Sequence, residues 1–246
     1  MTLKSRKLPG LFALALPLFV AGCDEAGCDD DSPKDEPAVD APFEQWDLVD
    51  LSHTYEANIP IYPGGVPFEL QNLATIDQGY YINMFTTGEH VGTHVDAPSH
   101  FSEGGAHVDQ LPLTALTGPL VLLDISPQAE EENDYAVTVD DLQAWEQEHG
   151  EIPSGAFVVA NSGWWQRWSE PESYLNTDAE GIMRFPGFSA EAVDFLLESR
   201  EVLGIGVDTL STDIGSSATF DEHHLFLGAG KIHIENLTNL DGLPAS

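Results

Sequence analysis

One eleven-residue segment, from His90 to His100, concentrates the groups of this chain that could do chemistry. It reads H-V-G-T-H-V-D-A-P-S-H, with three histidines and an aspartate at alternating or fourth positions. In an extended chain such positions lie on one face. Imidazole nitrogens and a carboxylate oxygen suit zinc and other divalent first-row ions. The spacing therefore predicts a metal site that draws on His90, His94, Asp96 and His100.

A helix would also bring residues four positions apart together, but this segment has the wrong composition for one. Gly92, Thr93 and Val95 are weak helix formers, and Pro98 would interrupt a helix. We therefore expect an extended or looped segment. The plainer alternative is a polar strand end whose histidines bond to the backbone. Four such groups within eleven residues favour the metal site.

The start of the chain has the features of an exported protein. Three basic residues precede an apolar stretch over residues 8–20, which is too short to span a bilayer. Val20-Ala21-Gly22-Cys23 then resembles a bacterial lipobox, whose cysteine is lipidated and becomes the new N-terminus. We expect a lipoprotein signal peptide over residues 1–22 and a lipid anchor on Cys23 at the bacterial cell envelope, periplasmic or outer. An ordinary signal peptide is the alternative.

Residues 23–42 differ sharply in composition from the rest of the chain. They contain eight acidic residues, one lysine and almost no large apolar side chains, which is typical of a disordered, extended tether. The folded domain should occupy residues 43–246. It contains no cysteine, because the only two are Cys23 and Cys28. No disulfide or thiolate ligand is therefore expected within it.

The charge of the chain excludes some partners. It has 8 basic and 42 acidic residues, a formal net charge of −34. Removal of the signal peptide would leave 5 basic against 42 acidic residues, or −37. Such a surface repels nucleic acid and anionic membranes, so we expect neither as a partner.

Strand-like segments outnumber helical ones in the expected domain. Short runs rich in Val, Ile, Leu and aromatics predict strands over residues 46–51, 80–85, 120–125, 156–160, 202–207 and 232–234. Two helices are expected, over residues 139–149 after Thr138 and over residues 190–200 after Ser189. Strands and helices do not alternate regularly, which favours a single α/β or α+β domain with a mixed sheet over a doubly wound one.

The chain resembles the cyclase family of metal-dependent hydrolases, whose best-known members are bacterial kynurenine formamidases. The family pattern H-x-G-T-H-x-D-x-P-x-H is matched at every fixed position of residues 90–100. Further similarity covers residues 50–64, 161–164, 204–213 and 223–240. The resemblance implies a swivelling β/β/α fold, which agrees with the mixed sheet expected above, and an assembly that is often a homodimer.

The resemblance also implies which residues bind metal. His90 and His94 would hold one ion, and Asp96 would be shared by two. Glu235 would be the second shared carboxylate, and His223 would complete the second set, because the family histidine lies twelve residues before the glutamate. Two divalent ions are thus implied, zinc in the first place with manganese as the alternative.

Two further roles are implied by the resemblance, and one choice stays open. His100 corresponds to the family's proton donor and acceptor, and Tyr62 lies in the segment that resembles the substrate loop. His224 adjoins His223 and is an alternative ligand.

The remaining histidines and tryptophans have plainer interpretations. His233 alternates with Glu235 but is interpreted as structural. Surface or capping roles are expected for three histidines that lack ligand partners at useful spacing: His53, His107 and His149. A tryptophan cluster could line an aryl pocket, but is more typical of a core or dimer contact: Trp164, Trp165 and Trp168.

The function implied is metal-dependent hydrolysis of an amide C–N bond in a small molecule. The resemblance points to an arylformamidase that converts N-formylkynurenine to kynurenine and formate. Two observations keep an isatin-like cyclic amide as an alternative. Tyr62-Pro63-Gly64-Gly65 stands where formamidases show tryptophan before Pro-Gly-Asp, and tryptophan breakdown is not ordinarily an exported activity. A non-catalytic metal-binding lipoprotein is the alternative of another class.

Overall fold

A mixed five-stranded sheet forms the centre of the computed structural model, which describes residues 12–13 and 47–246. Its strand order is β4 (His94–Asp96), β11 (Ile232–Glu235), β10 (Gly204–Val207), β8 (Phe157–Asn161) and β6 (Leu120–Asp124). The last four strands run parallel, and β4 pairs antiparallel with β11. The predicted α/β class with a mixed sheet is therefore confirmed.

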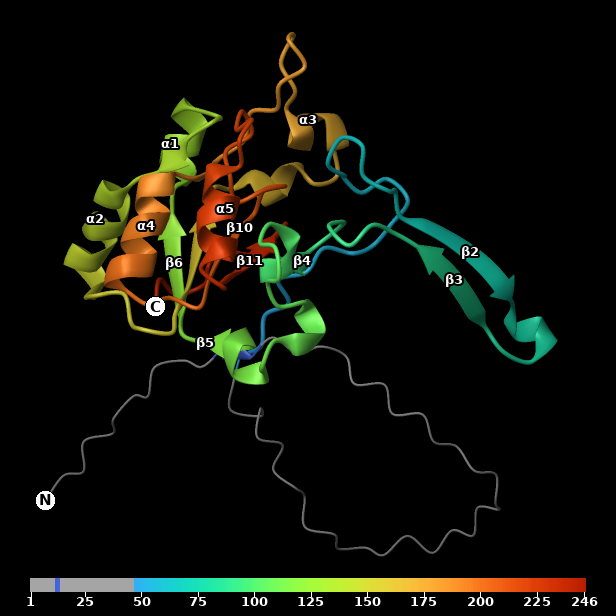
Figure 1. Ribbon diagram of the computed structural model, residues 1–246. Helices are drawn as coiled ribbons and strands as arrows, with labels where there is room; N and C mark the ends of the chain where they lie inside the picture. The colour runs from blue at the N-terminus through green and yellow to red at the C-terminus, as the bar shows by residue number, and fades with distance from the viewer. Residues whose placement is uncertain (1–11, 14–46) are drawn as a thin grey trace, which may run out of the picture.

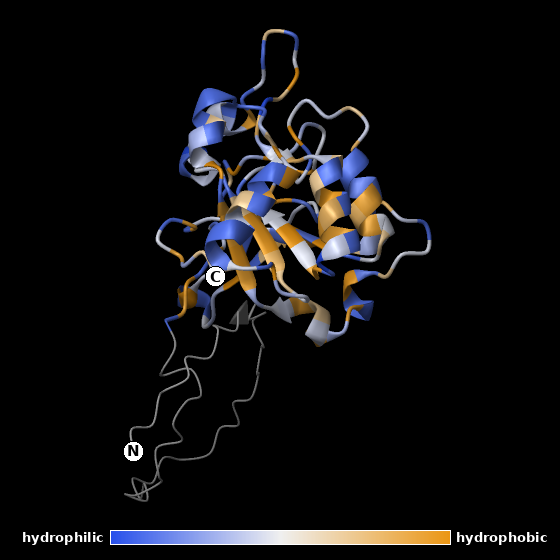
Figure 2. Cartoon of the chain, turned by 90° about the vertical axis from the view of Figure 1, so that its left-hand side faces the viewer, coloured by the Kyte–Doolittle hydropathy of each residue, from blue (hydrophilic) through white to orange (hydrophobic). Residues whose placement is uncertain are grey.

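Three helices cover one face of this sheet: α2 (Val139–His149), α4 (Ala190–Ser199) and α5 (Asp221–Gly228) (Figure 1). Their apolar sides meet the buried strand residues in the main core, where Leu142, Leu196 and Phe226 are fully buried. Figure 2 shows the strands largely in hydrophobic colours and the outward sides of the helices in hydrophilic ones. One-sided coverage follows from amphipathic helices facing near-continuous apolar strands.

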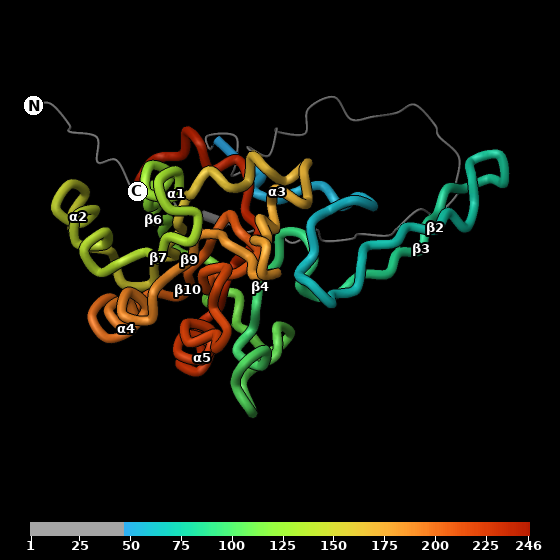
Figure 3. Tube along the Cα trace, turned by 90° about the horizontal axis from the view of Figure 1, so that it is seen from above, coloured from blue at the N-terminus to red at the C-terminus, as the bar shows by residue number. Residues whose placement is uncertain are grey.

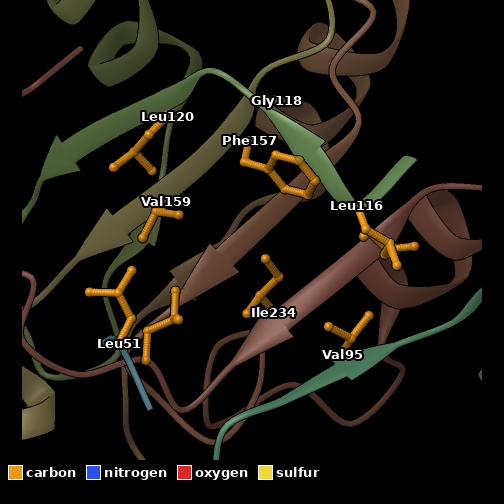
Figure 4. A pocket seen from close by; sticks show the side chains of 10 residues that line it. Leu51, Val95, Leu116, Gly118, Leu120, Phe157, Val159 and Ile234 are labelled. Atoms are coloured by element: carbon orange, nitrogen blue, oxygen red, sulfur yellow. The ribbon is translucent and has the colours of Figure 1, made fainter. Parts of the chain in front are cut away.

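The opposite face of the sheet is partly covered by the ends of the domain. Leu51, Leu237 and Leu240 pack there on Leu122 and Val159. Beside them the sheet leaves an apolar hollow, shown in Figure 4 and lined by Leu51, Val95, Leu116, Gly118, Leu120, Phe157, Val159, Ile232, Ile234 and Leu237.

A two-stranded ribbon projects from the body of the molecule. It is made of β2 (Glu69–Ala74) and β3 (Ile82–Thr86), which pair antiparallel around the short 3-10 helix η1 (Ile76–Gln78). Figures 1 and 3, which view the molecule from two directions, both show it extending away from the sheet. Nearly all its side chains are exposed, so within one chain it has no second layer to pack against.

The remaining elements are short and connect the larger ones. They are β1 (Phe12–Ala13), η2 (Pro98–His100), η3 (Val108–Gln110), η4 (Leu113–Leu116), β5 (Thr117–Gly118), α1 (Ser126–Glu131), β7 (Ala136–Val137), η5 (Trp164–Arg167), α3 (Pro171–Leu175) and β9 (Gly187–Phe188). No helix within the described residues has the length and apolarity needed to cross a membrane.

Both predicted helices are confirmed. Thr138 caps α2 by accepting a hydrogen bond from the Asp141 backbone N–H at 3.2 Å, and the Asp141 carboxylate accepts one from the Thr138 N–H at 2.8 Å. Ser189 caps α4 through the Ala192 N–H at 3.1 Å. The second helix ends at Ser199, one residue earlier than predicted.

The strand predictions hold except at the N-terminal edge. Residues 47–51 form no strand, because this part is exposed until Leu51 and touches a neighbour only by the single bridge between Ser52 and Leu237. The strand expected over 80–85 begins at Ile82, and that expected over 202–207 begins at Gly204. Trp46, Cys23 and the predicted tether lie outside the described residues, as does the predicted signal peptide apart from Phe12–Ala13.

Candidate active site

The pairing of β4 with β11 assembles the centre of the site. In this antiparallel register Asp96 lies opposite His233, and Glu235 lies opposite His94. On β4, His94 and Asp96 are two positions apart, and on β11 the same holds for His233 and Glu235. Side chains two positions apart on a strand point to the same side, so all four share one face of the sheet. Four potential ligands therefore converge from two short strands.

A turn before β4 adds the first histidine. Gly92 has a φ of +71°, and a Cβ at this position would lie 2.7 Å from the Tyr55 ring, so both the backbone conformation and the space favour glycine. The turn brings His90 Nδ1 to 3.2 Å from His94 Nε2 and to 2.7 Å from Asp96 Oδ1. His94 Nε2 lies 3.2 Å from the same oxygen.

Residues 90–100 combine an extended part with turns, within the extended or looped segment that was predicted. Only residues 94–96 are strand, while His90 precedes a turn and His100 ends the short helix η2 that begins at Pro98. Pro98 starts this helix because proline is tolerated in a first helical turn.

Helix α5 carries both His223 and His224, and its orientation determines which of the two faces the site. His223 is buried, with its Nε2 3.5 Å from Glu235 Oε1 and 3.7 Å from Asp96 Oδ2. His224 is exposed and packs its ring against Phe101. His223 is therefore the one in place to act as a ligand.

Two overlapping groups of side chains are close enough to hold a metal ion around Asp96. We call His90, His94 and Asp96 the outer set, and Asp96, His223, His233 and Glu235 the inner set. His94 Nε2 also lies 3.4 Å from Glu235 Oε2, which joins the two sets a second time. The inner set is entirely buried, whereas the His90 side chain is 38% exposed.

Hydrogen bonds on the far side of the rings fix their orientation. His94 Nδ1 lies 2.9 Å from the Gly92 carbonyl oxygen, and His223 Nδ1 lies 2.7 Å from Asp213 Oδ2. Donation to these acceptors leaves each Nε2 free to bind a cation. Glu235 is held by the Thr212 backbone N–H, which donates to its Oε1 at 3.0 Å.

The buried carboxylates of the site favour positive charge on the groups next to them. Burial alone lowers the pKa of His94, but Asp96 and Glu235 outweigh it and raise the pKa to about 9. Burial likewise opposes protonation of His223, yet the carboxylates around it, Asp213 first, raise its pKa to about 12. Burial would raise the pKa of Asp96, and the surrounding histidines bring it below its ordinary value. Imidazolium protons therefore occupy the place that suits a metal cation.

Asp96 provides the test of whether a cation fits. The residue is 1% exposed, and its polar neighbours at hydrogen-bond distance are imidazole nitrogens, His90 Nδ1 at 2.7 Å and His94 Nε2 at 3.2 Å, neither in regular hydrogen-bond geometry. A carboxylate buried in this way carries a large desolvation cost unless positive charge, on the imidazoles or on a bound cation, offsets it. The donor set of imidazole and carboxylate groups suits zinc or manganese. The residues present thus fit a divalent metal ion.

His100 lies beside the two sets but belongs to neither. Its ring stacks on His90 with the centroids 3.9 Å apart, and it lies 6.0 Å from the ring of His223. Burial lowers the pKa of His100 to about 4, so the ring is neutral near pH 7. A neutral imidazole at this point can accept a proton.

Aromatic side chains lie beside His100 and next to His223 of the inner set. Phe101 lies 4.7 Å from His223 and 5.6 Å from Phe220 between ring centroids. Tyr62 reaches the same group, with its ring 6.4 Å from that of Phe220. Phe220 has a φ of +51°, a costly left-handed conformation for an aromatic residue, and it directly precedes α5. Together these rings form an apolar wall at the metal-binding groups.

Several contributors were not identified from the sequence. Asp213, Thr212 and Glu222 orient the ligands, and Phe101 and Phe220 build the wall. No local spacing marks them, although Phe101 adjoins His100. His233, interpreted from sequence as structural, is fully buried in the inner set.

The other predicted assignments had mixed outcomes. Trp164 and Trp168 lie in a core cluster, as expected. His107 and His149 are exposed. The surface or capping role of His53 is wrong, because its ring stacks on buried Trp168 with centroids 3.8 Å apart. Desolvation there lowers the pKa of His53 to about 4.

Comparison with known proteins gives a consistent result. The family model described as "Putative cyclase" matches residues 49–214. Isatin hydrolase of Roseibium aggregatum is 34% identical over 171 residues, which are 66% of this chain and 64% of that protein. Kynurenine formamidase of Paracidovorax citrulli is 28% identical over 80% of this chain and 84% of its own.

A solved structure supports the same relationship. Isatin hydrolase A from Ralstonia solanacearum superposes with a TM-score of 0.75 at 36% identity, covering 80% of this chain and 81% of that one. With the motif at residues 90–100 and the site described above, these matches show that the chain belongs to the cyclase family of metal-dependent hydrolases.

Proposed function

We propose that the protein hydrolyses the C–N bond of an aryl amide with the help of divalent metal ions. The observation that carries this proposal is the buried carboxylate of Asp96, which histidines face from both sets beside an aromatic wall. A scavenger of metal would need the ligands but not the wall or a neutral histidine beside it. The enzyme is therefore favoured over a non-catalytic metal-binding lipoprotein.

One ion would be held by His90, His94 and Asp96, and a second by Asp96, His223 and Glu235. Zinc is the first candidate for both ions, and manganese is the alternative. When bound, such ions polarise a carbonyl oxygen and lower the pKa of water. Asp96, which is common to both sets, and Glu235, which belongs to the inner set and adjoins His94, offset part of the charge of two cations. Support for two ions comes from the two donor sets that overlap at Asp96.

The remaining residues would bind the substrate and move its proton. Phe101, Phe220 and Tyr62 can pack against an aryl ring and keep bulk water from the reacting carbonyl. His100 would accept a proton as water adds to the carbonyl carbon, and return it to the nitrogen as the C–N bond breaks. The products are a carboxylate and a free amine.

Two aryl amides are candidate substrates. In an isatin-like ring, hydrolysis would open the ring and keep both products in one molecule, whereas a formamide such as N-formylkynurenine would release formate. The higher identity to isatin hydrolases, 34–36% against 28%, favours the cyclic amide. The formamide predicted from sequence remains the second candidate.

A substrate screen decides between them. The purified protein, reconstituted separately with zinc and with manganese, is assayed against isatin, aryl formamides and lactones. Hydrolysis of isatin well above that of the formamides supports the cyclic amide, and the reverse order supports the arylformamidase. If none of these substrates is hydrolysed with either metal, the proposed reaction is wrong.

We also propose that the protein is a homodimer whose projecting ribbon contacts the second copy. A two-stranded ribbon is marginally stable alone, and this one exposes large apolar side chains on both strands. Among them Leu70 is 59% and Phe85 66% exposed. A second copy would supply the missing layer.

Lipid anchoring at Cys23 is a separate proposal that rests on sequence alone. The variant Cys23→Ser should be unlipidated and leave the detergent fraction. Mass spectrometry that finds no lipid on the wild-type protein would refute the anchor and leave the hydrolase proposal untouched.

A further inference from the structure

We propose that His233 is a fourth protein donor to the inner set, so that the inner ion is enclosed by protein whereas the outer ion keeps an open position for the reaction. This inference rests on the proposed metal site. It adds a residue for which the sequence motifs assign no role and gives the two ions different tasks.

The sheet register places His233 where a donor is needed. It lies directly opposite Asp96 in the β4–β11 ladder and two positions before Glu235, so its side chain shares their face. The residue is 0% exposed, and its Nδ1 lies 3.8 Å from Asp96 Oδ2. A modest shift would bring both atoms to a common cation.

A buried carboxylate holds the far side of the His233 ring. Glu222 Oε1 lies 3.0 Å from His233 Nε2, and Glu222 is itself 1% exposed. The two atoms are at ion-pair distance but not in regular hydrogen-bond geometry, so Glu222 would attract a proton to Nε2 and leave Nδ1 to face the inner set. Asp213 takes the corresponding place for His223, where its Oδ2 is hydrogen-bonded to Nδ1 at 2.7 Å. Both imidazoles of the inner set thus have the carboxylate–histidine arrangement that orients metal ligands.

The plainer alternative is a buried imidazole that only makes hydrogen bonds. His233 Nδ1 does lie 3.2 Å from Thr212 Oγ1. That hydroxyl donates to Glu222 Oε2 at 2.5 Å, so it can accept a hydrogen bond from Nδ1 but cannot donate one to it; an Nδ1 without its proton therefore has no donor there. Since the two interpretations differ only in whether metal binding needs His233, metal content distinguishes them.

The difference between the two sets suggests different tasks. Four protein donors, His223, His233, Asp96 and Glu235, fill the coordination of a zinc ion that has a structural role, whereas three donors leave a position for water or substrate. The outer set has three closely placed donors and includes the partly exposed His90, whose ring stacks on His100. We therefore assign the reaction to the outer ion. The inner ion would stabilise the fold around the site.

The experiment measures zinc retained per chain as the purified protein is dialysed against increasing chelator. We expect the wild-type protein to lose its two ions in separate steps, the outer one first. His233→Gln should lose the tightly held ion and keep the weaker one. His90→Gln should show the opposite pattern. The exposed neighbour provides the matched control, because His224→Gln should match the wild-type curve.

A second variant keeps the test decisive if His233→Gln fails to fold. Glu222→Gln should retain both ions but bind the inner one roughly 10- to 100-fold more weakly, the usual effect of removing a group that orients a ligand. Wild-type retention of both ions by His233→Gln, or an unchanged inner affinity in Glu222→Gln, would overturn the inference. Failure of the wild-type protein to hold any ion would instead refute the proposed function.

Discussion

His100 and His94 lie six positions apart in one motif, yet the structure gives them different surroundings. His94 contacts Asp96 and Glu235, whereas His100 contacts the ring of His90 and the aromatic wall. Removing each should therefore have a different effect on the protein.

We predict that His100→Ala keeps near-normal metal content and loses about 10² to 10⁴ in turnover, the usual contribution of a positioned acid or base. His94→Ala should lose metal and activity together. Metal analysis and steady-state kinetics on both variants check this. Loss of an ion from His100→Ala, or wild-type hydrolysis of anilides by it, would contradict the role proposed for His100.

The sequence predicts ligands that lie close together along the chain well, and ligands that are far apart along the chain poorly. His90, His94 and Asp96 lie within seven residues, so their spacing alone indicates a shared site. Glu222 and His233 acquire their importance only through the β4–β11 register and the position of α5. No spacing rule links them to the motif.

The helices α2 and α4 are joined at their C-terminal ends by an ion pair. Arg200 donates from Nε to Glu146 Oε1 at 2.5 Å and from Nη2 to Oε2 at 2.8 Å. Glu146 also accepts the Ile152 backbone N–H at 3.0 Å. The hydrogen bonds from Arg200 lower the pKa of Glu146, although burial opposes this effect.

We predict that Glu146→Gln lowers the free energy of unfolding by about 1.5 to 3 kcal/mol at pH 7, the range for hydrogen bonds to charged groups. Because the folded-state pKa is lowered, this stabilisation is present above the unfolded value and disappears as pH falls through the folded one. Urea unfolding at several pH values tests this. The exposed Glu148 on the same helix gives the control Glu148→Gln, and a deficit in Glu146→Gln that persists unchanged in acid would contradict the explanation.

Element prediction from the sequence succeeded where local signals are strong. The capping residues Thr138 and Ser189 located both long helices. It failed at residues 47–51, where apolar composition suggested a strand but no neighbouring strand extends far enough to pair. The positive φ of Phe220 is likewise a tertiary outcome that composition does not encode.

The whole molecule combines a compact sheet-and-helix body with the projecting ribbon β2–β3 (Figure 3). Its strong negative charge opposes association through the surface at large, with 42 acidic against 8 basic residues. Any dimer contact should therefore concentrate where apolar side chains replace charges, which is the case on the ribbon.

We predict that Phe85→Glu shifts the protein toward monomers, because it places a charge among the apolar side chains that would be buried between copies. Sedimentation or light scattering measures the mass in solution. Leu113→Glu is the control, since Leu113 is 81% exposed but lies on η4, outside the ribbon. A monomeric wild-type protein, or a Phe85→Glu variant that stays dimeric, would contradict this contact.

The dependence of hydrolysis on metal tests the central claim most directly. Metal is removed completely from the purified protein and restored in steps, while the hydrolysis rate of isatin or an aryl formamide and the bound metal per chain are measured together. We expect no hydrolysis without metal, recovery as the ions bind, and higher thermal stability of the loaded protein, because the ions bind the native state. Full hydrolysis by the metal-free protein would contradict the account.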